Sequence, residues 1–218
     1  MKISDRALAL LKNFSSINQS IVIRKGNVLS TIHPMQTILA KANVDDTFGN
    51  TMAIHDLPQF LQVLSLFKQP ELELGTTSVL IHDDNKQSHY FYAEESLIDK
   101  PPTKEIKLES NVTFDLPFQA LSSILKAASI LSVADIAFVA EGGTLYIRAL
   151  EFGNQSSNTV SHKLGETSSE DFTAIFKPEY LLRLFDADYT VSLSNQLAKF
   201  EAKGLVTYWV AVESKSKF

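Results

Sequence analysis

Residues 135–150 read DIAFVAEGGTLYIRAL, two alternating apolar runs joined by a glycine pair. A short glycine turn between two such runs is typical of a β-hairpin. Residues 20–32 read SIVIRKGNVLSTI and predict a second hairpin, which turns at Gly26-Asn27. Because an amphipathic segment with helical spacing precedes each stretch, the two hairpins indicate an α+β unit that occurs twice in the chain.

The repeat continues downstream of both hairpins. An Ala-Ile pair leads into LPQFLQVL in the first half, at 53–54, and another leads into PEYLLRLF in the second, at 174–175. Each half ends in an aromatic strand, HYFYAEE at 89–95 and TYWVAVE at 207–213. The repeated order of helix, hairpin, strands, helix and strands predicts two similar domains, each with two helices packed on antiparallel sheets.

A connector is predicted between the two halves. Residues 99–111 read DKPPTKEIKLESN, and the two prolines with mixed charges are typical of an extended linker. We therefore place the first domain at 1–100, the connector at 101–111 and the second domain at 112–218.

The composition excludes several classes of protein. The 218 residues include no cysteine, which excludes a disulfide framework, a thiolate metal site and a cysteine nucleophile. The first residues show no secretory signal, and no uncharged apolar run approaches the roughly 18 residues of a membrane helix. The net charge of −5 argues against a uniformly basic nucleic-acid binder.

Catalytic motifs are missing from the sequence. It contains no phosphate-binding glycine loop, no nucleophile elbow and no His-Glu-x-x-His zinc motif. The best metal candidate is His82-Asp83-Asp84 with His89, but a hairpin turn at Asp83-Asp84-Asn85 is the favoured interpretation. We therefore expect no enzyme activity, no cofactor and no metal.

The four predicted helices have apolar stripes on one face and residues suited to their first turns. These first-turn and capping residues are Ser4, Asp56, Asp115 and Pro178. The fourth helix is expected to bury Leu181, Leu182 and Phe185. The outward faces carry Gln, Ser and a few cations, and over the helices as a whole the acidic and basic residues cancel. Small surface helices that happen to be lightly charged explain this pattern as well as a functional role does.

One family resemblance covers the whole chain. Residues 10–27, LLKNFSSINQSIVIRKGN, look like the N-terminal helix and first hairpin of the sliding clamps of T-even-type phages. Residues 208–214, YWVAVES, look like their last strand. The length, the lack of cysteine and the internal repeat also match. The resemblance implies a homotrimeric ring of clamp-type domains, with helices lining the hole and strands forming the outer layer.

The resemblance also implies a function and partners. Such a clamp encircles duplex DNA without reading its sequence, and increases the processivity of the phage replicative polymerase. An ATP-dependent clamp loader opens and closes the ring, and the polymerase is tethered through its C-terminal tail. Related phages also use the loaded clamp for late transcription. The expected location is the cytoplasm of the infected bacterial host, away from membranes.

The expected DNA-facing residues are the cations on the outward helix faces. A few cations among Gln and Ser attract phosphates without holding the DNA at one fixed position. An acidic exterior steers DNA toward the hole. Lys12 and Lys126 occupy corresponding places in the repeat, whereas Glu179 departs from a basic lining. The DNA-facing set is Arg6, Lys12, Lys126, Lys177 and Arg183.

A partner pocket and subunit contacts are expected from position alone. The pocket residues are Ile32, Pro34, Met35, Trp209, Ala211 and Val212. Ordinary sheet core is an equal alternative for Trp209. Subunits are expected to join through exposed sheet edges, at 89–95 in one copy and 159–164 in the next. The alternative function is a phage structural or protein-interaction module built from the same duplicated α+β domains.

Overall fold

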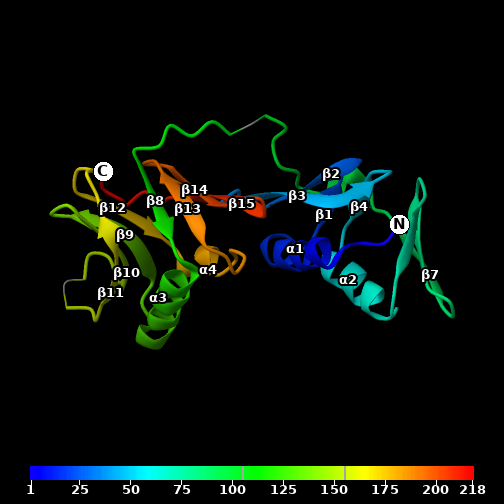
Figure 1. Ribbon diagram of the computed structural model, residues 1–218, viewed down its shortest axis with the longest axis horizontal. Helices are drawn as coiled ribbons and strands as arrows, with labels where there is room; N and C mark the ends of the chain where they lie inside the picture. Colours follow the sequence, from blue (N-terminus) through cyan, green and yellow to red (C-terminus); the bar gives the residue numbers. More distant parts are fainter. Residues whose placement is uncertain (105, 155) are drawn as a thin grey trace. The chain divides into compact units, whose positions relative to one another are not determined.

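The computed structural model describes residues 1–104, 106–154 and 156–218. The chain divides into two compact units, Met1–Glu105 with Gly204–Val206 and Ile106–Lys203 with Thr207–Phe218 (Figure 1). This division falls within the predicted connector, of which Glu105 lies outside the described residues. Each unit contains two α-helices packed with antiparallel strands, so the predicted α+β class is confirmed.

Unit 1 contains two helices and three groups of paired strands. Its elements are α1 (Asp5–Ile17), β1 (Ile21–Ile23), β2 (Gly26–Ile32), β3 (Ile38–Phe48), β4 (Met52–Ile54), α2 (Leu57–Ser65), β5 (Glu71–Leu74), β6 (Ser78–His82), β7 (Gln87–Phe91) and the short 3-10 helix η1 (Glu95–Leu97). Strand β1 pairs with β4, β2 pairs with β3, and β5, β6 and β7 form a meander. Helix α1 packs on β2 and β3 and against α2 (Figure 1).

Unit 2 contains two four-stranded antiparallel arrangements. Its elements are β8 (Val112–Leu116), α3 (Phe118–Leu131), β9 (Asp135–Glu141), β10 (Thr144–Leu150), β11 (Val160–Glu166), β12 (Phe172–Phe176), α4 (Pro178–Leu181), β13 (Tyr189–Leu193), β14 (Leu197–Ala202) and β15 (Val206–Ala211). The strand orders are β11-β10-β9-β12 and β15-β14-β13-β8. Helix α3 packs on β9, β10 and β11.

The two units share local hydrogen bonds at matching places, which supports the predicted repeat. Between β5 and β6, the N–H of Gly75 donates to the carbonyl of Ser78 at 2.9 Å. Between β13 and β14, the N–H of Ser194 donates to the carbonyl of Leu197 at the same distance. Strands β5 and β13, and likewise β6 and β14, are therefore equivalent elements of the repeat.

The two predicted hairpins differ in outcome. Residues 135–150 form the β9–β10 hairpin, in which Gly142 and Gly143 have φ values of 55° and 79°, as a type I′ turn requires. The hairpin predicted at 20–32 is wrong, because β1 pairs with β4 and β2 pairs with β3. Gly26 is already the first residue of β2, and the register shifts between Gly26 and Val28, so Gly26-Asn27 form an irregularity within a strand.

The predicted caps of the first two helices are confirmed, and that of the third is wrong. The Ser4 hydroxyl accepts from the N–H of Ala7, and the Asp56 carboxylate accepts from the N–H of Gln59. Asp115 instead lies within β8. The first turn of α3 is bound by Asp188, whose carboxylate accepts from the N–H of Phe118 at 2.7 Å. Only the fold brings this distant aspartate to the helix.

The fourth helix is shorter than the sequence suggests. α4 ends at Leu181 after a single turn, and the chain continues through turns. Tyr180, Leu181 and Leu184 are buried, whereas Leu182 is 65% exposed. The expectation that Leu182 is buried is wrong, because neighbouring helical positions differ by about 100° around the axis and Leu181 already faces the core. Phe185 is half-buried.

Loss of the distant cap should destabilise unit 2. We expect Asp188→Ala to lower the free energy of unfolding by about 1 kcal/mol, because the N–H of Phe118 loses its carboxylate acceptor. The measurement is urea unfolding followed by circular dichroism. The control is Asp115→Ala, which should cost less than about 0.5 kcal/mol as an exposed strand substitution. An equal loss in both variants would contradict the assignment of the cap.

Candidate nucleic-acid interface

Lys12 and Lys126 occupy exposed positions in the middle of α1 and α3. In α1, the neighbouring Leu11 and Phe14 are buried, so Lys12 points away from the core. In α3, Ile124 and Ala128 are buried in the same way around Lys126. Both ammonium groups therefore stand on the solvent side of a helix whose other side packs on strands.

Arg6 is held by the fold of unit 1. Its guanidinium donates to the carbonyl of Asn43 at 3.1 Å and to that of Gly204. The carboxylate of Asp45 lies 3.9 Å away and is largely exposed. These contacts fasten the start of α1 to β3 and leave less of the guanidinium available to an outside anion.

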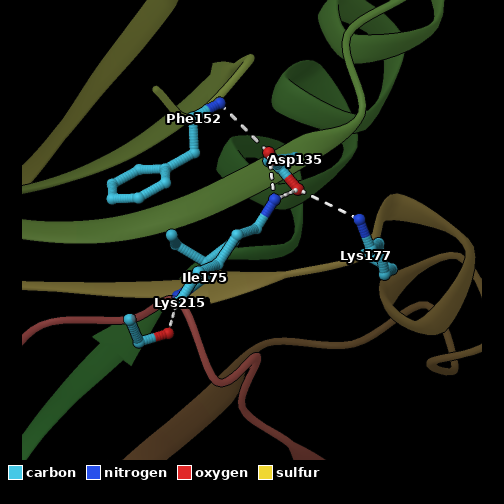
Figure 2. Close-up of polar contacts among 6 residues, drawn as sticks. Asp135, Phe152, Ile175, Lys177 and Lys215 are labelled. Atoms are coloured by element: carbon cyan, nitrogen blue, oxygen red, sulfur yellow. Dashed lines mark hydrogen bonds and ion pairs between the residues drawn. The ribbon is translucent and has the colours of Figure 1, made fainter. Parts of the chain in front are cut away.

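Lys177 is also engaged within its unit, by a buried aspartate that the sequence did not single out. Its Nζ lies 3.3 Å from Oδ1 of Asp135, a residue only 1% exposed at the start of β9. Lys215 contacts both carboxylate oxygens at 2.6 Å, and the N–H of Phe152 donates to Oδ2 at 3.1 Å. Figure 2 shows the two ammonium groups and the amide converging on Asp135. Lys177 thus serves a buried ion-pair cluster.

The Asp135 cluster favours the charged carboxylate. Burial by itself raises the pKa of Asp135, but hydrogen bonds from Lys215, Phe152 and Lys177, with the positive charge of Lys215, lower it below its ordinary value. Asp135 therefore stays ionised at neutral pH, and its charge is compensated by two lysines whose side chains are about one-third exposed.

The C-terminal segment that carries Lys215 is also attached to β12. The N–H of Glu213 donates to the carbonyl of Ile175 at 2.9 Å, and Lys217 exchanges main-chain hydrogen bonds with Thr173. The Phe218 ring stacks on Phe172 with 5.8 Å between centroids. The segment therefore pairs with β12 alongside the ion-pair cluster.

Arg183 stands just beyond α4 and is half-buried. Glu179, in the first turn of α4, is exposed. The surface around α4 is therefore of mixed charge, as the sequence indicates.

Two lysines outside the expected DNA-facing set join Lys12 in a groove between α1 and α2. Lys2 precedes α1 and Lys68 follows α2, and both line this groove of about 340 Å³ together with Lys12. Helical periodicity could not find them, because neither lies within a helix. The apolar floor and rim of the groove include Leu8, Leu61, Leu64 and Phe67.

The predicted pocket residues are distributed over both units. Ile32 ends β2, and Pro34 and Met35 follow in an exposed turn, where Met35 is 67% exposed. In β15, Trp209 and Ala211 are half-buried on the face opposite the buried Tyr208 and Val210, and Val212 follows half-buried. Trp209 therefore belongs to the less buried face of its strand, and the pocket stays a prediction.

The predicted subunit edges correspond to the ends of two sheets. Strand β7 is the outer strand of β5-β6-β7, and β11 is the outer strand of β11-β10-β9-β12. Each edge exposes an apolar side chain, Phe91 on β7 and Val160 on β11.

The interpretation of the Asp83 region as a turn is supported by its hydrogen bonds. The Asp83 carboxylate accepts from the N–H groups of Asn85 and Lys86, and the N–H of Asp83 donates to the carbonyl of Lys86. Within the described ranges, no group of three or more His, Asp or Glu side chains is arranged to hold a metal ion. None of the helices in the described part of the chain has the length and apolar character of a membrane span.

Comparisons with known proteins agree on one family. The profile described as "DNA polymerase processivity factor" matches residues 4–96. The chain is 29% identical to the sliding clamp of Vibrio phage KVP40, over 98% of this chain and 100% of the relative. It is 26% identical to the sliding clamps of Escherichia phage RB69 and Enterobacteria phage T4, over 99% of this chain and 98% of each relative. The resemblance to the sliding clamps of T-even-type phages is confirmed.

Solved structures show the same fold. PCNA from A. fulgidus superimposes with a TM-score of 0.70 at 13% identity, over 94% of each chain. A putative DNA polymerase III beta subunit from Eubacterium rectale superimposes with a TM-score of 0.73 at 13% identity, over 98% of this chain and 64% of that one. At such identities the likeness concerns the fold, which is the clamp type.

Removal of the buried charge should make unit 2 less stable and less sensitive to acid. We expect Asp135→Asn to lower the free energy of unfolding at pH 7 by about 3 kcal/mol, because two lysines lose their shared counter-ion. The pKa of Asp135 is lowered in the folded state, so its stabilisation is full above the unfolded pKa of about 3.9 and is lost as the pH falls through the folded pKa.

The measurement is thermal or urea unfolding of both proteins between neutral pH and about pH 3, across the unfolded pKa. The stability difference between them should shrink in the acid range. The matched control is Asp186→Asn, an exposed aspartate of the same unit, which should change little. A difference that stays constant with pH would show that the carboxylate charge is not what stabilises the cluster.

Proposed function

We propose that this chain, which resembles the sliding clamps of T-even-type phages over nearly its whole length, is itself such a clamp. Three copies would form a ring that encircles duplex DNA and tethers the replicative DNA polymerase. The observation that carries the proposal is the clamp fold, present as two equivalent α+β units in one chain that aligns end to end with phage clamps.

The proposed ring holds DNA by topology, so its wall must attract the duplex without binding it tightly. Lys12 and Lys126 suit that purpose, because each is an exposed ammonium group in the middle of a helix. Each phosphate that such a group neutralises adds affinity that is independent of sequence and falls with salt. Base-reading contacts would oppose sliding, and the ring carries out no reaction of its own.

The other expected cations contribute to the proposed wall in different ways. Arg183 adds to the electrostatic field near α4. Arg6 and Lys177 have a mainly structural role, because two carbonyl groups bind the guanidinium of Arg6 and Asp135 binds Lys177. Their role is to position α1 and the start of α4.

The proposed subunit contact joins β7 of one copy to β11 of the next, with residues 101–111 connecting domains 1–100 and 112–218. Support comes from the position of both strands at sheet edges, where unpaired main-chain groups accept a further strand. Repetition of one head-to-tail contact closes a ring when the rotation permits it.

Partners follow from the proposed function. A loader that hydrolyses ATP opens the ring, and the C-terminal tail of the polymerase docks among the pocket residues. Those residues are Ile32, Pro34, Met35, Trp209, Ala211 and Val212, of which Met35 is an exposed apolar side chain suited to contact with a hydrophobic tail. Late-transcription factors would use the same loaded ring, and the site of action is the cytoplasm of the infected bacterium.

The central test is processive synthesis. With the cognate polymerase, loader and ATP, the protein should increase the length of products made in a single binding event on primed circular DNA by at least about tenfold, because a tethered polymerase rebinds before it is lost. The readout is product length on a denaturing gel with a trap for free polymerase. Omission of the loader is the control, and unchanged product length with all components present would refute the function.

A second test concerns the wall. Charge reversal by Lys12→Glu with Lys126→Glu should reduce retention of loaded clamp on nicked circular DNA about tenfold near physiological salt, because attractive phosphate contacts become repulsive. The unmodified protein and the double variant should both have a mass of about three times 24.2 kDa by light scattering, which would show that the variant still assembles.

The matched control applies the same charge change away from the helices. Lys41→Glu with Lys203→Glu alters two exposed lysines on β3 and in the turn before β15 and should leave retention unchanged. Normal retention of the Lys12 and Lys126 variant, or an equal loss in the control, would remove these residues from the DNA-facing set.

A further inference from the structure

The groove between α1 and α2 collects positive charge from three different parts of unit 1. Lys12 comes from α1, Lys2 from the segment before it and Lys68 from the turn after α2. Asp5 lines the same groove, and Glu71, Asp83 and Asp84 line a neighbouring hollow with Lys2 and Lys68. A linear anion that crosses the groove would therefore meet three ammonium groups within one small surface.

The equivalent strand position in unit 2 carries the opposite charge. Lys2 forms an isolated antiparallel bridge with Glu71 at the start of β5. Asp115, in β8, is paired with Thr190 of β13. Strands β5 and β13 are equivalent, and Glu71 and Thr190 stand the same number of residues before the matching turns, so these two residues are counterparts. Their strand partners, Lys2 and Asp115, are therefore counterparts as well.

The counterpart of Lys68 is likewise surrounded by acid. Lys68 stands three residues before Glu71, and Ala187 stands three residues before Thr190. Ala187 is flanked by Asp186 and Asp188, both exposed. The first helix of each unit keeps a lysine, Lys12 or Lys126, while the counterpart of Lys2 is the acidic Asp115 and that of Lys68 is the neutral Ala187 between two aspartates.

The hydrogen bonds of these groups leave the contrast in charge intact. Asp188 accepts from the N–H of Phe118 and Asp115 from the hydroxyl of Thr190, so both aspartates bind neutral donors and keep their charge. In unit 1, Lys2 forms an exposed ion pair with Glu71 at 3.5 Å, which salt and solvent weaken.

Lys68 has a different neighbour. The carboxylate of Asp83 accepts from the N–H groups of Lys68, Asn85 and Lys86, so it is held by main-chain donors. The side chain of Lys68 is exposed at the groove.

We propose that the sugar–phosphate backbone of duplex DNA is attracted mainly by the unit 1 groove, on Lys12, Lys68 and Lys2, and more weakly at the equivalent place in unit 2, where Asp115, Asp186 and Asp188 offset the charge of Lys126. The proposal rests on the sliding-clamp function proposed above and adds an asymmetry between the two units. A ring of three copies then presents three cationic grooves that alternate with three acidic positions. The duplex is attracted at separated points, which limits the number of phosphates neutralised at once and keeps the hold weak enough for sliding.

The lack of cysteine permits a direct test of this asymmetry. Single cysteines are introduced by Gln69→Cys, beside Lys68, and by Ala187→Cys, between the two aspartates, so that all the charges discussed remain in place. Each protein is labelled with a thiol-specific photocrosslinker and loaded onto primed circular DNA with loader and ATP. Crosslinks to DNA are then counted per clamp retained on the circle.

The expected result is a crosslinking yield at position 69 that exceeds the yield at 187 by about fivefold or more, because local phosphate density follows local charge. Addition of Lys68→Gln to the Gln69→Cys protein should reduce its yield at least about twofold, since one of three cations is removed. Addition of Asp186→Asn to the Ala187→Cys protein should raise its yield.

Three outcomes would overturn the asymmetry when the labelled clamps remain on the circles: equal yields at the two positions, a higher yield at 187, or no crosslinks at either position. None of these outcomes would contradict the clamp function. Failure of the unmodified protein to remain on circular DNA with its cognate loader would overturn both proposals. The two failures are therefore distinguished by the retention measurement.

Discussion

In each half of this chain, main-chain hydrogen bonding ties the segment after the last strand to the strand before the second helix. In unit 1 the N–H of Ala93 donates to the carbonyl of Ala53, and in unit 2 the N–H of Glu213 donates to that of Ile175, both at 2.9 Å. In unit 1 the return brings Ile98 onto Val22 and Ala53. The helices thus pack on one side of strands whose other side is covered by the returning chain.

The return is reinforced differently in the two units. In unit 2 it continues into a C-terminal segment whose Lys215 binds the buried carboxylate of Asp135, while in unit 1 apolar contacts are joined by an exposed ion pair between Arg24 and Glu95. Burial of a carboxylate is costly unless the group is paired and hydrogen-bonded, and Figure 2 shows two lysines and one N–H group around Asp135. This cluster uses Lys177, which by sequence alone looked available to DNA. The lysines that remain for an outside anion are those whose surroundings contain no buried acid.

The repeat conserves main-chain geometry more closely than charge. The turns at Gly75 and Ser194 make the same hydrogen bond, yet Lys2 in one unit corresponds to Asp115 in the other. This difference is compatible with one fold because both side chains are exposed and contribute little to packing. In the proposed ring around DNA, this difference would make the electrostatic potential of the wall uneven. The net charge of −5 therefore describes the whole protein but not the surface that would meet the duplex.

Local sequence alone determined the helix starts at Ser4 and Asp56, the β9–β10 hairpin and the duplication, because each depends on neighbouring residues or on periodicity. Tertiary structure decided which strand pairs with β1, which aspartate binds the start of α3 and which lysines are engaged. The carboxylate of Asp188 reaches Phe118 across 70 residues, and Asp135 meets Lys215 across 80. Such partners leave no local pattern in the sequence, because their spacing is set by how the sheets pack and not by the period of any one element.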